Sequence, residues 1–176
     1  MKVGKAGIEL IKRYESLRLT SYQDPGGTYT IGWGATYYQD GTRVKAGQSI
    51  SNQAAESLLN FGVGVAENTV TRLVKNSLTQ SQFDALVSFV FNVGTGNFSQ
   101  SSLLNKINEN PADLETINTA FGLWNKSKGK VYQGLINRRN AEFALYANGT
   151  GSSKTNIVII VIVIFIILIL YYFLSK

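Results

Sequence analysis

Hydropathy divides this 176-residue chain sharply near residue 150. Residues 157–174 read IVIIVIVIFIILILYYFL, without a charged or strongly polar side chain. As a helix, a segment of about 18 residues rises about 27 Å, which is close to the hydrocarbon thickness of a bilayer. The alternative is a buried strand or core helix, but that requires an abnormally long strand or a helix without any polar face. The segment therefore predicts one C-terminal transmembrane helix, with the lipid bilayer as a partner.

The rest of the chain suits one globular domain followed by a linker. Residues 1–147 are enough to bury a sizeable core. Residues 148–156 are mostly small and polar, as in a flexible tether. The N-terminal residues lack the apolar stretch of a signal peptide and have instead the pattern of an amphipathic helix that buries Ile8 and Ile11. We therefore expect a single-pass membrane protein that is anchored only at its C-terminal end.

The composition excludes several kinds of site. Because the sequence has no histidine and no cysteine, it can form no Ser-His-Asp triad, thiol nucleophile, disulfide, or histidine- or cysteine-based zinc site. The net charge of +6 favours anionic partners. Nucleic acid is not expected among them, since the basic residues are scattered and no recognition motif accompanies them.

Turn and capping signals predict a mainly helical α+β domain with one small antiparallel sheet. Residues 18–38 alternate and turn at residues 25–27, which predicts a hairpin or a three-stranded sheet. Thr79 and Gln82 have the spacing of a capping box at the start of a central helix. Other helices are expected over about 51–75, from about Ser99, from Pro111 and from about Tyr132.

A short segment near the N-terminus brings together two acids and a hydroxyl. Glu15 ends the first predicted helix, Asp24 precedes a Pro-Gly-Gly turn, and Thr30 lies on the returning strand. Each acid alone is typical of a solvated helix end or an ordinary turn. Two carboxylates with an intervening hydroxyl, however, are the groups needed to protonate a glycosidic oxygen and to direct a water at the sugar carbon. The combination points to glycoside hydrolysis.

The spacing of these three residues resembles that of the phage-type lysozymes, or endolysins, of glycoside hydrolase family 24. Residues 30–34 match the family's Thr-Ile-Gly-Tyr/Trp-Gly, residues 82–98 resemble its next segment, and residues 134–142 resemble its Gly-Leu-x-x-Arg-Arg-x-x-Glu. The three blocks occur in the family's order and cover about residues 5–147. The C-terminal apolar segment is a departure, because a membrane segment in this family usually stands at the N-terminus.

The resemblance implies a fold and a substrate. The fold would be a two-lobed lysozyme domain, with the sheet in a small lobe, a long bridging helix and a larger helical lobe. The cleft between the lobes would take the glycan strand of bacterial peptidoglycan. The enzyme would hydrolyse the β-1,4 bond between N-acetylmuramic acid and N-acetylglucosamine. No metal ion or organic cofactor is implied, because two acids and a water suffice.

The resemblance also implies a role for each site residue. Glu15 would be the general acid, because the negative end of the helix dipole and partial shielding from water both favour its protonated form. Asp24 would stay ionised and act on a water that the Thr30 hydroxyl helps to hold, which predicts inversion at the anomeric carbon. One of two adjacent arginines is expected to reach an acid near the site, although both also suit a solvated helix face. The candidates for substrate binding are Gly32, Trp33, Asn92, Gly94, Arg138 and Arg139.

Two other functions suit the same fold. A lytic transglycosylase would cut the same bond with one acid and no hydrolytic water, and Asp24 and Thr30 argue against it. A non-catalytic wall-binding membrane protein would keep the fold without the activity. The predicted anchor allows two locations: the host cytoplasmic membrane, with a role in lysis, or the lipid membrane of a virion, with a role in wall penetration. Because Lys154 and Lys176 flank the apolar segment on opposite sides, the positive-inside rule does not decide on which side of the membrane the domain lies.

Overall fold

The computed structural model describes residues 1–24 and 26–149, which form helices and four short strands. In chain order the elements are α1 Lys5–Tyr14, β1 Arg18–Gln23, β2 Tyr29–Gly32, α2 Asn52–Leu73, α3 Gln80–Val93, α4 Thr95–Ser99, α5 Ser102–Glu109, α6 Leu114–Gly122, β3 Lys126–Ser127, β4 Lys130–Val131 and α7 Gln133–Asn148.

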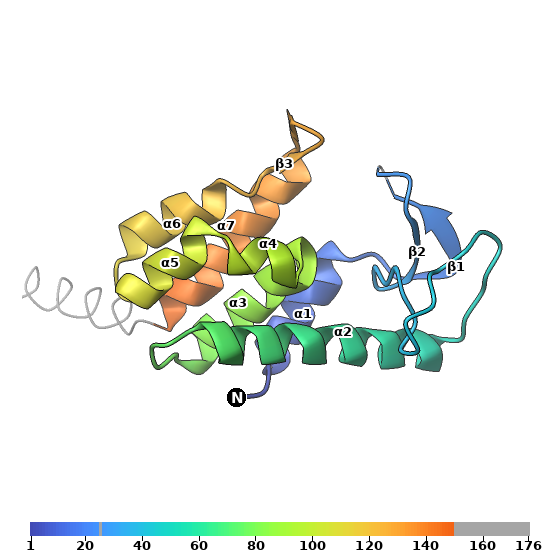
Figure 1. The fold of residues 1–176 in the computed structure, drawn as a ribbon, viewed down its shortest axis with the longest axis horizontal. Helices are drawn as coiled ribbons and strands as arrows, with labels where there is room; N and C mark the ends of the chain where they lie inside the picture. The colour runs from blue at the N-terminus through green and yellow to red at the C-terminus, as the bar shows by residue number, and fades with distance from the viewer. Residues whose placement is uncertain (25, 150–176) are drawn as a thin grey trace, which may run out of the picture.

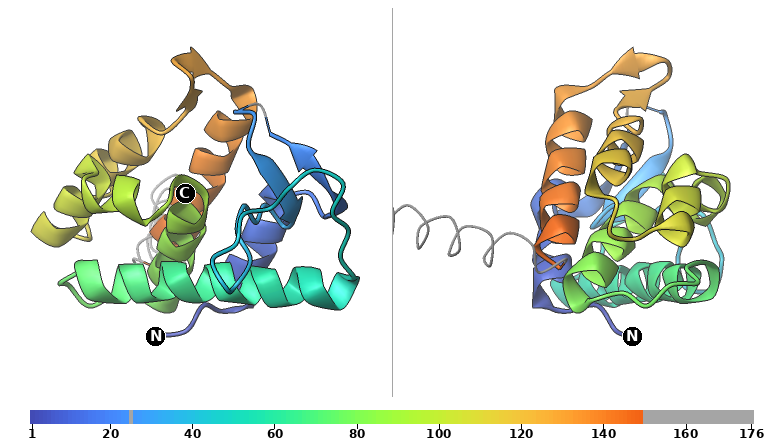
Figure 2. Two further views of the ribbon diagram at one scale, coloured as in Figure 1. Left: turned by 45° about the vertical axis from the view of Figure 1, so that its right-hand side comes forward. Right: turned by 90° about the vertical axis from the view of Figure 1, so that its left-hand side faces the viewer.

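The long helix α2 runs beneath two lobes (Figure 1). The β1–β2 sheet and its loops lie over the N-terminal part of α2, and the other helices gather over its C-terminal part. The left view of Figure 2 shows the same division, and both of its views show the β3–β4 hairpin at the top of the larger lobe. The prediction of a mainly helical α+β fold with a small antiparallel sheet is confirmed.

The small sheet has two strands. β1 pairs antiparallel with β2, with Tyr22 opposite Thr30, and the register shifts between Arg18 and Tyr22, as in a β-bulge. A third segment meets β1 only through an isolated bridge between Thr20 and Ser49. The hairpin therefore brings the end of β1 beside the start of β2, as the turn at residues 25–27 predicts.

Helix α3 forms the centre of the larger lobe. Phe83, Leu86, Phe89 and Val90 are each at most 2% exposed, and α3 packs against α1, α2 and α7. The ring of Phe89 meets that of Phe121 edge to face, with centroids 5.3 Å apart. Aliphatic and aromatic residues at helical spacing along α3 thus form the core around which the other helices are placed.

Helix α1 is oriented by two buried acids from other helices. Gly4, its N-cap, has no side chain to accept from the first turn. Asp84 of α3 supplies that acceptor, since its carboxylate receives Gly4 N–H at 2.8 Å and Gly7 N–H at 3.3 Å. Glu67 of α2 receives Val3 N–H at 2.7 Å. These bonds fix the start of the helix whose other end carries Glu15.

Local capping decides where the helices begin. The capping box at Thr79 and Gln82 is confirmed. The predicted helix start at Pro111 is wrong, because Asp113 caps α6 by accepting Thr116 N–H. The Pro111 carbonyl instead accepts a hydrogen bond from the Tyr146 hydroxyl at 3.0 Å.

No helix within the two described ranges is both long and apolar enough to cross a membrane. The longest of them, α2, spans 22 residues but carries Glu56, Glu67 and Arg72. This finding contradicts the predicted localisation as a single-pass membrane protein of the host or of a virion. The apolar residues 157–174, on which that prediction rested, lie outside the described residues.

Candidate active site

Glu15 stands at the C-terminal end of α1, where the chain leaves the helix. Its backbone N–H still donates to the Ile11 carbonyl at 3.0 Å, while its own φ and ψ are extended. The side chain is 19% exposed, so the expected partial shielding from water is present. Glu15 therefore combines a position at the negative end of a helix with limited access to solvent.

Gly34 forms one wall of the Glu15 site. Its φ is +89°, which strains any residue with a side chain, and a Cβ there would lie 2.9 Å from Glu15 Oε2. The backbone of the loop after β2 therefore comes so close to the carboxylate that only glycine fits at this position.

Arg138 is the arginine that reaches Glu15. Its Nη1 lies 2.5 Å from Glu15 Oε1, and its side chain is 3% exposed. The same guanidinium donates through Nε to Glu142 Oε1 at 3.0 Å and through Nη2 to the Ser88 carbonyl at 3.3 Å. Arg138 thus shares its charge between Glu15 and a second acid, Glu142.

Arg139 also contacts Glu142, but its second polar partner is Asn92 and not Glu15. Its Nη2 donates to Asn92 Oδ1 and to Glu142 Oε1, both at 3.0 Å. Its guanidinium also lies over the Phe89 ring, 4.8 Å from the centroid. Burial lowers the pKa of Arg139 to about 10, although the negative charge of Glu142 acts to raise it. Arg139 is thus a buried link between α7 and Asn92, not a partner of Glu15.

Asp24 is held by the turn that follows β1. Its Oδ1 accepts the Thr28 N–H at 2.8 Å, and its own N–H donates to the Thr28 carbonyl at 2.9 Å. Its carbonyl accepts the Gly27 N–H at 2.9 Å. The carboxylate is therefore fixed by main-chain groups of its own turn.

Thr30 and Tyr22 face each other across the hairpin near Asp24. Thr30 is 4% exposed, and its hydroxyl donates to the Thr28 carbonyl at 3.2 Å. The pKa of Tyr22 is raised, first by burial and then by the negative charges of Glu15 and Asp24, while Arg18 acts in the opposite sense. Both acids thus act electrostatically on the Tyr22 hydroxyl, which identifies Tyr22 as a site residue that the sequence analysis missed.

Two cavities lie along the cleft beside Glu15. A cavity of about 460 Å³ extends from Gly34 in the small lobe to Gly94 in the larger one. A second, of about 380 Å³, is lined by Glu15, Asn92 and Arg138 together with residues of the β3–β4 hairpin. Glu15 lines the second cavity, and Gly34, which lies close to its carboxylate, lines the first. Asn92 and Gly94 both line this cleft.

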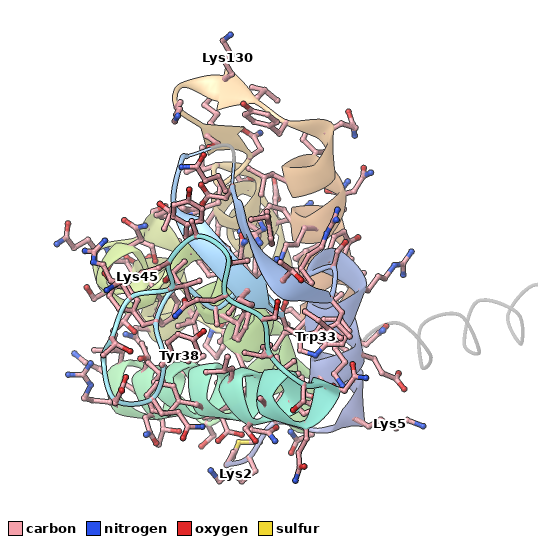
Figure 3. All side chains as sticks on the ribbon, turned by 90° about the vertical axis from the view of Figure 1, so that its right-hand side faces the viewer. Lys2, Lys5, Trp33, Tyr38, Lys45 and Lys130 are labelled. Atoms are coloured by element: carbon pink, nitrogen blue, oxygen red, sulfur yellow. The ribbon has the colours of Figure 1, made fainter. Side chains whose placement is uncertain are left out.

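The two remaining candidates differ in their surroundings. Trp33 lines the larger cavity and donates through Nε1 to Glu56 Oε1 at 3.1 Å, with Lys12 Nζ 5.0 Å from its ring centroid. Figure 3 shows Trp33 beside α1 and α2. Gly32 is buried where β2 packs against α2, and its φ of +65° favours glycine, although a Cβ there would make only an ordinary contact, 3.5 Å from Ala55 of α2. Trp33, in contrast, presents an aromatic face to the cleft.

Two further residues of the network, Ser88 and Glu142, were not predicted as site residues. Glu142 follows the two arginines at the spacing of helical ion pairs, a signal that the sequence contains. Nothing in the sequence near Ser88 indicates that it meets them. No group of three or more acidic side chains in the described part of the chain is placed to hold a metal ion.

Known proteins share this arrangement of helices, sheet and cleft. A family model described as phage lysozyme matches residues 12–142. The chain belongs to the phage lysozyme family, and its fold is that of the family.

Individual relatives extend this match. The endolysin of Bacillus phage PZA is 46% identical over 152 residues, which cover 85% of this chain and 57% of that relative, so the chain spans little more than half the relative's length. The endolysin from Escherichia coli O157:H7 phage FAHEc1 superposes with a TM-score of 0.74 at 34% identity, over 83% of this chain and 93% of that one. The muramidase domain of SpmX from Asticaccaulis excentricus does so with a TM-score of 0.70 at 36% identity, over 82% and 97% of the two chains.

Proposed function

We propose that residues 1–147 form a lysozyme domain of glycoside hydrolase family 24. It hydrolyses the β-1,4 bond between N-acetylmuramic acid and N-acetylglucosamine in peptidoglycan, and the similarity to endolysins supports a role in host lysis. The observation that carries the proposal is the Glu15 carboxyl in the wall of a cavity, in contact with the buried Arg138, with the negative charges of Glu15 and Asp24 both acting on the Tyr22 hydroxyl.

Glu15 is the general acid in this proposal. Its carboxyl lines one cavity and lies close to Gly34 in the wall of the other, and the glycosidic oxygen of a bound glycan would pass beside it. Arg138 orients the carboxyl by its contact with Oε1, and Gly34 confines Oε2. After the proton is given to the leaving oxygen, Arg138 stabilises the carboxylate that forms.

Asp24 and Thr30 hold the attacking water. The Thr30 hydroxyl already donates its proton to the Thr28 carbonyl, so it can only accept from the water. A water that donates one proton to Thr30 and the other to Asp24 directs its oxygen lone pair at the sugar carbon. Asp24 then takes the proton as the new bond forms, which inverts the anomeric centre.

The walls of the cleft bind the glycan in this proposal. Trp33, Asn92 and Gly94 line the cavities and are the residues that we expect to contact the sugars. Arg139 contributes indirectly, because it holds the Asn92 amide. Gly32 contributes indirectly as well, through the backbone conformation at the point where β2 packs against α2.

Digestion of purified peptidoglycan by the full chain tests the function. We expect release of reducing ends, and products whose mass includes the added water. Products lighter by one water, with an anhydro end, would assign the chain to the lytic transglycosylases. A folded chain that binds the wall and releases nothing from several wall types would replace the enzyme by a non-catalytic binding protein.

A further inference from the structure

One buried carboxylate holds both arginines of α7. Glu142 is 0% exposed and follows Arg138 and Arg139 by one turn of the helix. Its Oε1 accepts from Arg138 Nε and Arg139 Nη2 at 3.0 Å each, and from Ser88 Oγ at 2.8 Å. Its Oε2 lies 2.9 Å from Arg139 Nε. A single side chain therefore fixes two guanidinium groups and is itself held from α3.

Each guanidinium connects Glu142 to a residue of the cleft. Arg138 reaches Glu15, and Arg139 reaches Asn92. The two arginine side chains are 3% and 1% exposed, so water cannot replace Glu142 as their partner. The positions of the Glu15 carboxyl and of the Asn92 amide thus both depend on an acid that lies outside the cleft.

The charge of Glu142 also affects the protonation of Glu15. Burial raises the pKa of Glu142, while the two guanidiniums and the Ser88 hydroxyl favour its carboxylate. The carboxylate is the form that offsets the two buried cations in contact with it. Among the described residues, the charged or titratable groups near Glu15 include Arg138 from α7, Tyr22 from β1, and Tyr14 and Tyr132 in the same cavity, with Arg139 at longer range. Glu142 therefore offsets part of the charge that Arg138 presents to Glu15.

We propose that Glu142 is a positioning residue: by holding Arg138 and neutralising part of its charge, it allows Glu15 to carry the catalytic proton. This inference rests on the proposed function and adds a residue that touches neither the glycan nor the water.

The test is the pH dependence of peptidoglycan digestion by full-length Glu142→Gln. We expect kcat to fall roughly 10- to 100-fold with KM within about twofold of wild type. The alkaline limb of the pH profile should move to lower pH, because Glu15 loses its proton earlier when Arg138 is less neutralised. In E142Q/R139M one cation is removed with the anion, so the alkaline limb should return toward that of the wild type. A role in packing alone predicts no such return.

Two results would overturn the proposal. One is a folded E142Q, shown by circular dichroism and thermal unfolding, with the kcat and the alkaline limb of the wild type. The other is an E142Q/R139M variant whose alkaline limb stays where E142Q has it. If the wild type itself releases no reducing ends, the proposed function fails and not this inference alone.

Ser88→Ala provides a second test in case E142Q does not fold. It keeps every charge of the cluster and removes only the hydroxyl that favours the Glu142 carboxylate. We expect a smaller shift of the alkaline limb in the same direction. Ser57→Ala is the matched control, because the Ser57 hydroxyl donates only to the Gln53 carbonyl within α2. If E142Q does not fold and the profile of S88A equals that of S57A, the proposal is overturned.

Discussion

The two carboxylates of the cleft are held in opposite ways. Glu15 ends a helix, is 19% exposed and meets the buried guanidinium of Arg138, which comes from the far end of the chain. Asp24 lies in a turn and is fixed by the main chain of Thr28 a few residues away. Glu15 thus depends on the packing of the larger lobe, whereas Asp24 depends on local turn geometry.

The difference suits two different tasks. In the proposed mechanism Glu15 gives up a proton, and Arg138 is placed to stabilise the anion while Glu142 shares its charge. Asp24 is the proposed base, and the Thr28 N–H of its own turn donates to its carboxylate. If this comparison is correct, changes at the two acids should differ in their effects on activity, stability and electrostatics.

The largest effect is expected for Glu15→Gln. Glutamine keeps the shape but cannot supply the proton, so kcat/KM on peptidoglycan should fall roughly 10²–10⁴-fold. The free energy of unfolding should fall by about 1–3 kcal/mol, because the buried Arg138 guanidinium loses a charged partner. Reducing-end release and chemical denaturation measure the two quantities. A variant that keeps a large part of the wild-type activity would exclude Glu15 as the general acid.

Asp24→Asn should reduce activity by about 10²-fold without affecting the fold. Asparagine still presents an oxygen to the Thr28 N–H, so the free energy of unfolding should change by no more than about 0.5 kcal/mol. The same two assays apply. A stability loss larger than that of Glu15→Gln would show that Asp24 is not held locally, and the comparison would be wrong.

Gly34→Ala tests the confinement of Glu15. The added Cβ would lie 2.9 Å from Oε2, so the carboxyl must move, and we expect a loss of activity of about tenfold or more. Gly41→Ala is the matched control, because its φ is +83° but no atom lies within 4 Å of the added Cβ. Both variants should lose roughly 1–2 kcal/mol of stability from the strained φ. Equal activities in the two variants would show that the contact with Glu15 has no catalytic consequence.

The smallest effect is expected in the titration of Tyr22. Its pKa is raised first by burial, next by Glu15 and less by Asp24. Because a neighbouring negative charge disfavours tyrosinate, neutralising either acid should lower that pKa, and Glu15→Gln should lower it more than Asp24→Asn. An NMR titration of labelled tyrosine Cζ measures the change. The reverse order would place Asp24, not Glu15, nearer to the hydroxyl.

Local signals in the sequence predicted most of this arrangement. The capping box at Thr79 and the reversal of the chain between β1 and β2 are short-range features, and both are as expected. The β3–β4 hairpin was not predicted, because its turn uses Lys128 and Gly129 at positive φ in place of the usual Asn-Gly pair. The start of α6 likewise depends on capping by Asp113 and not on Pro111, where the proline alone predicts a helix start.

The connections across the fold could not be predicted. Arg138 and Glu15 are separated by 123 positions, so the sequence left open which of the two arginines reaches the site. The spacing of Glu142 indicated a helical ion pair, but not its complete burial or its bond to Ser88 of α3. These features depend on the packing of α7 against α3, which no local pattern specifies.

The most direct test of the two roles is the configuration of the first product. NMR of the reducing ends released from peptidoglycan, recorded before mutarotation, distinguishes the two anomers. With Glu15 as the acid and Asp24 acting on a water, the carboxyls should stand about 6.5–9.5 Å apart and the β-linked substrate should give the α-anomer first. Initial release of the β-anomer would contradict this account, because it would require a covalent intermediate or a water on the other face.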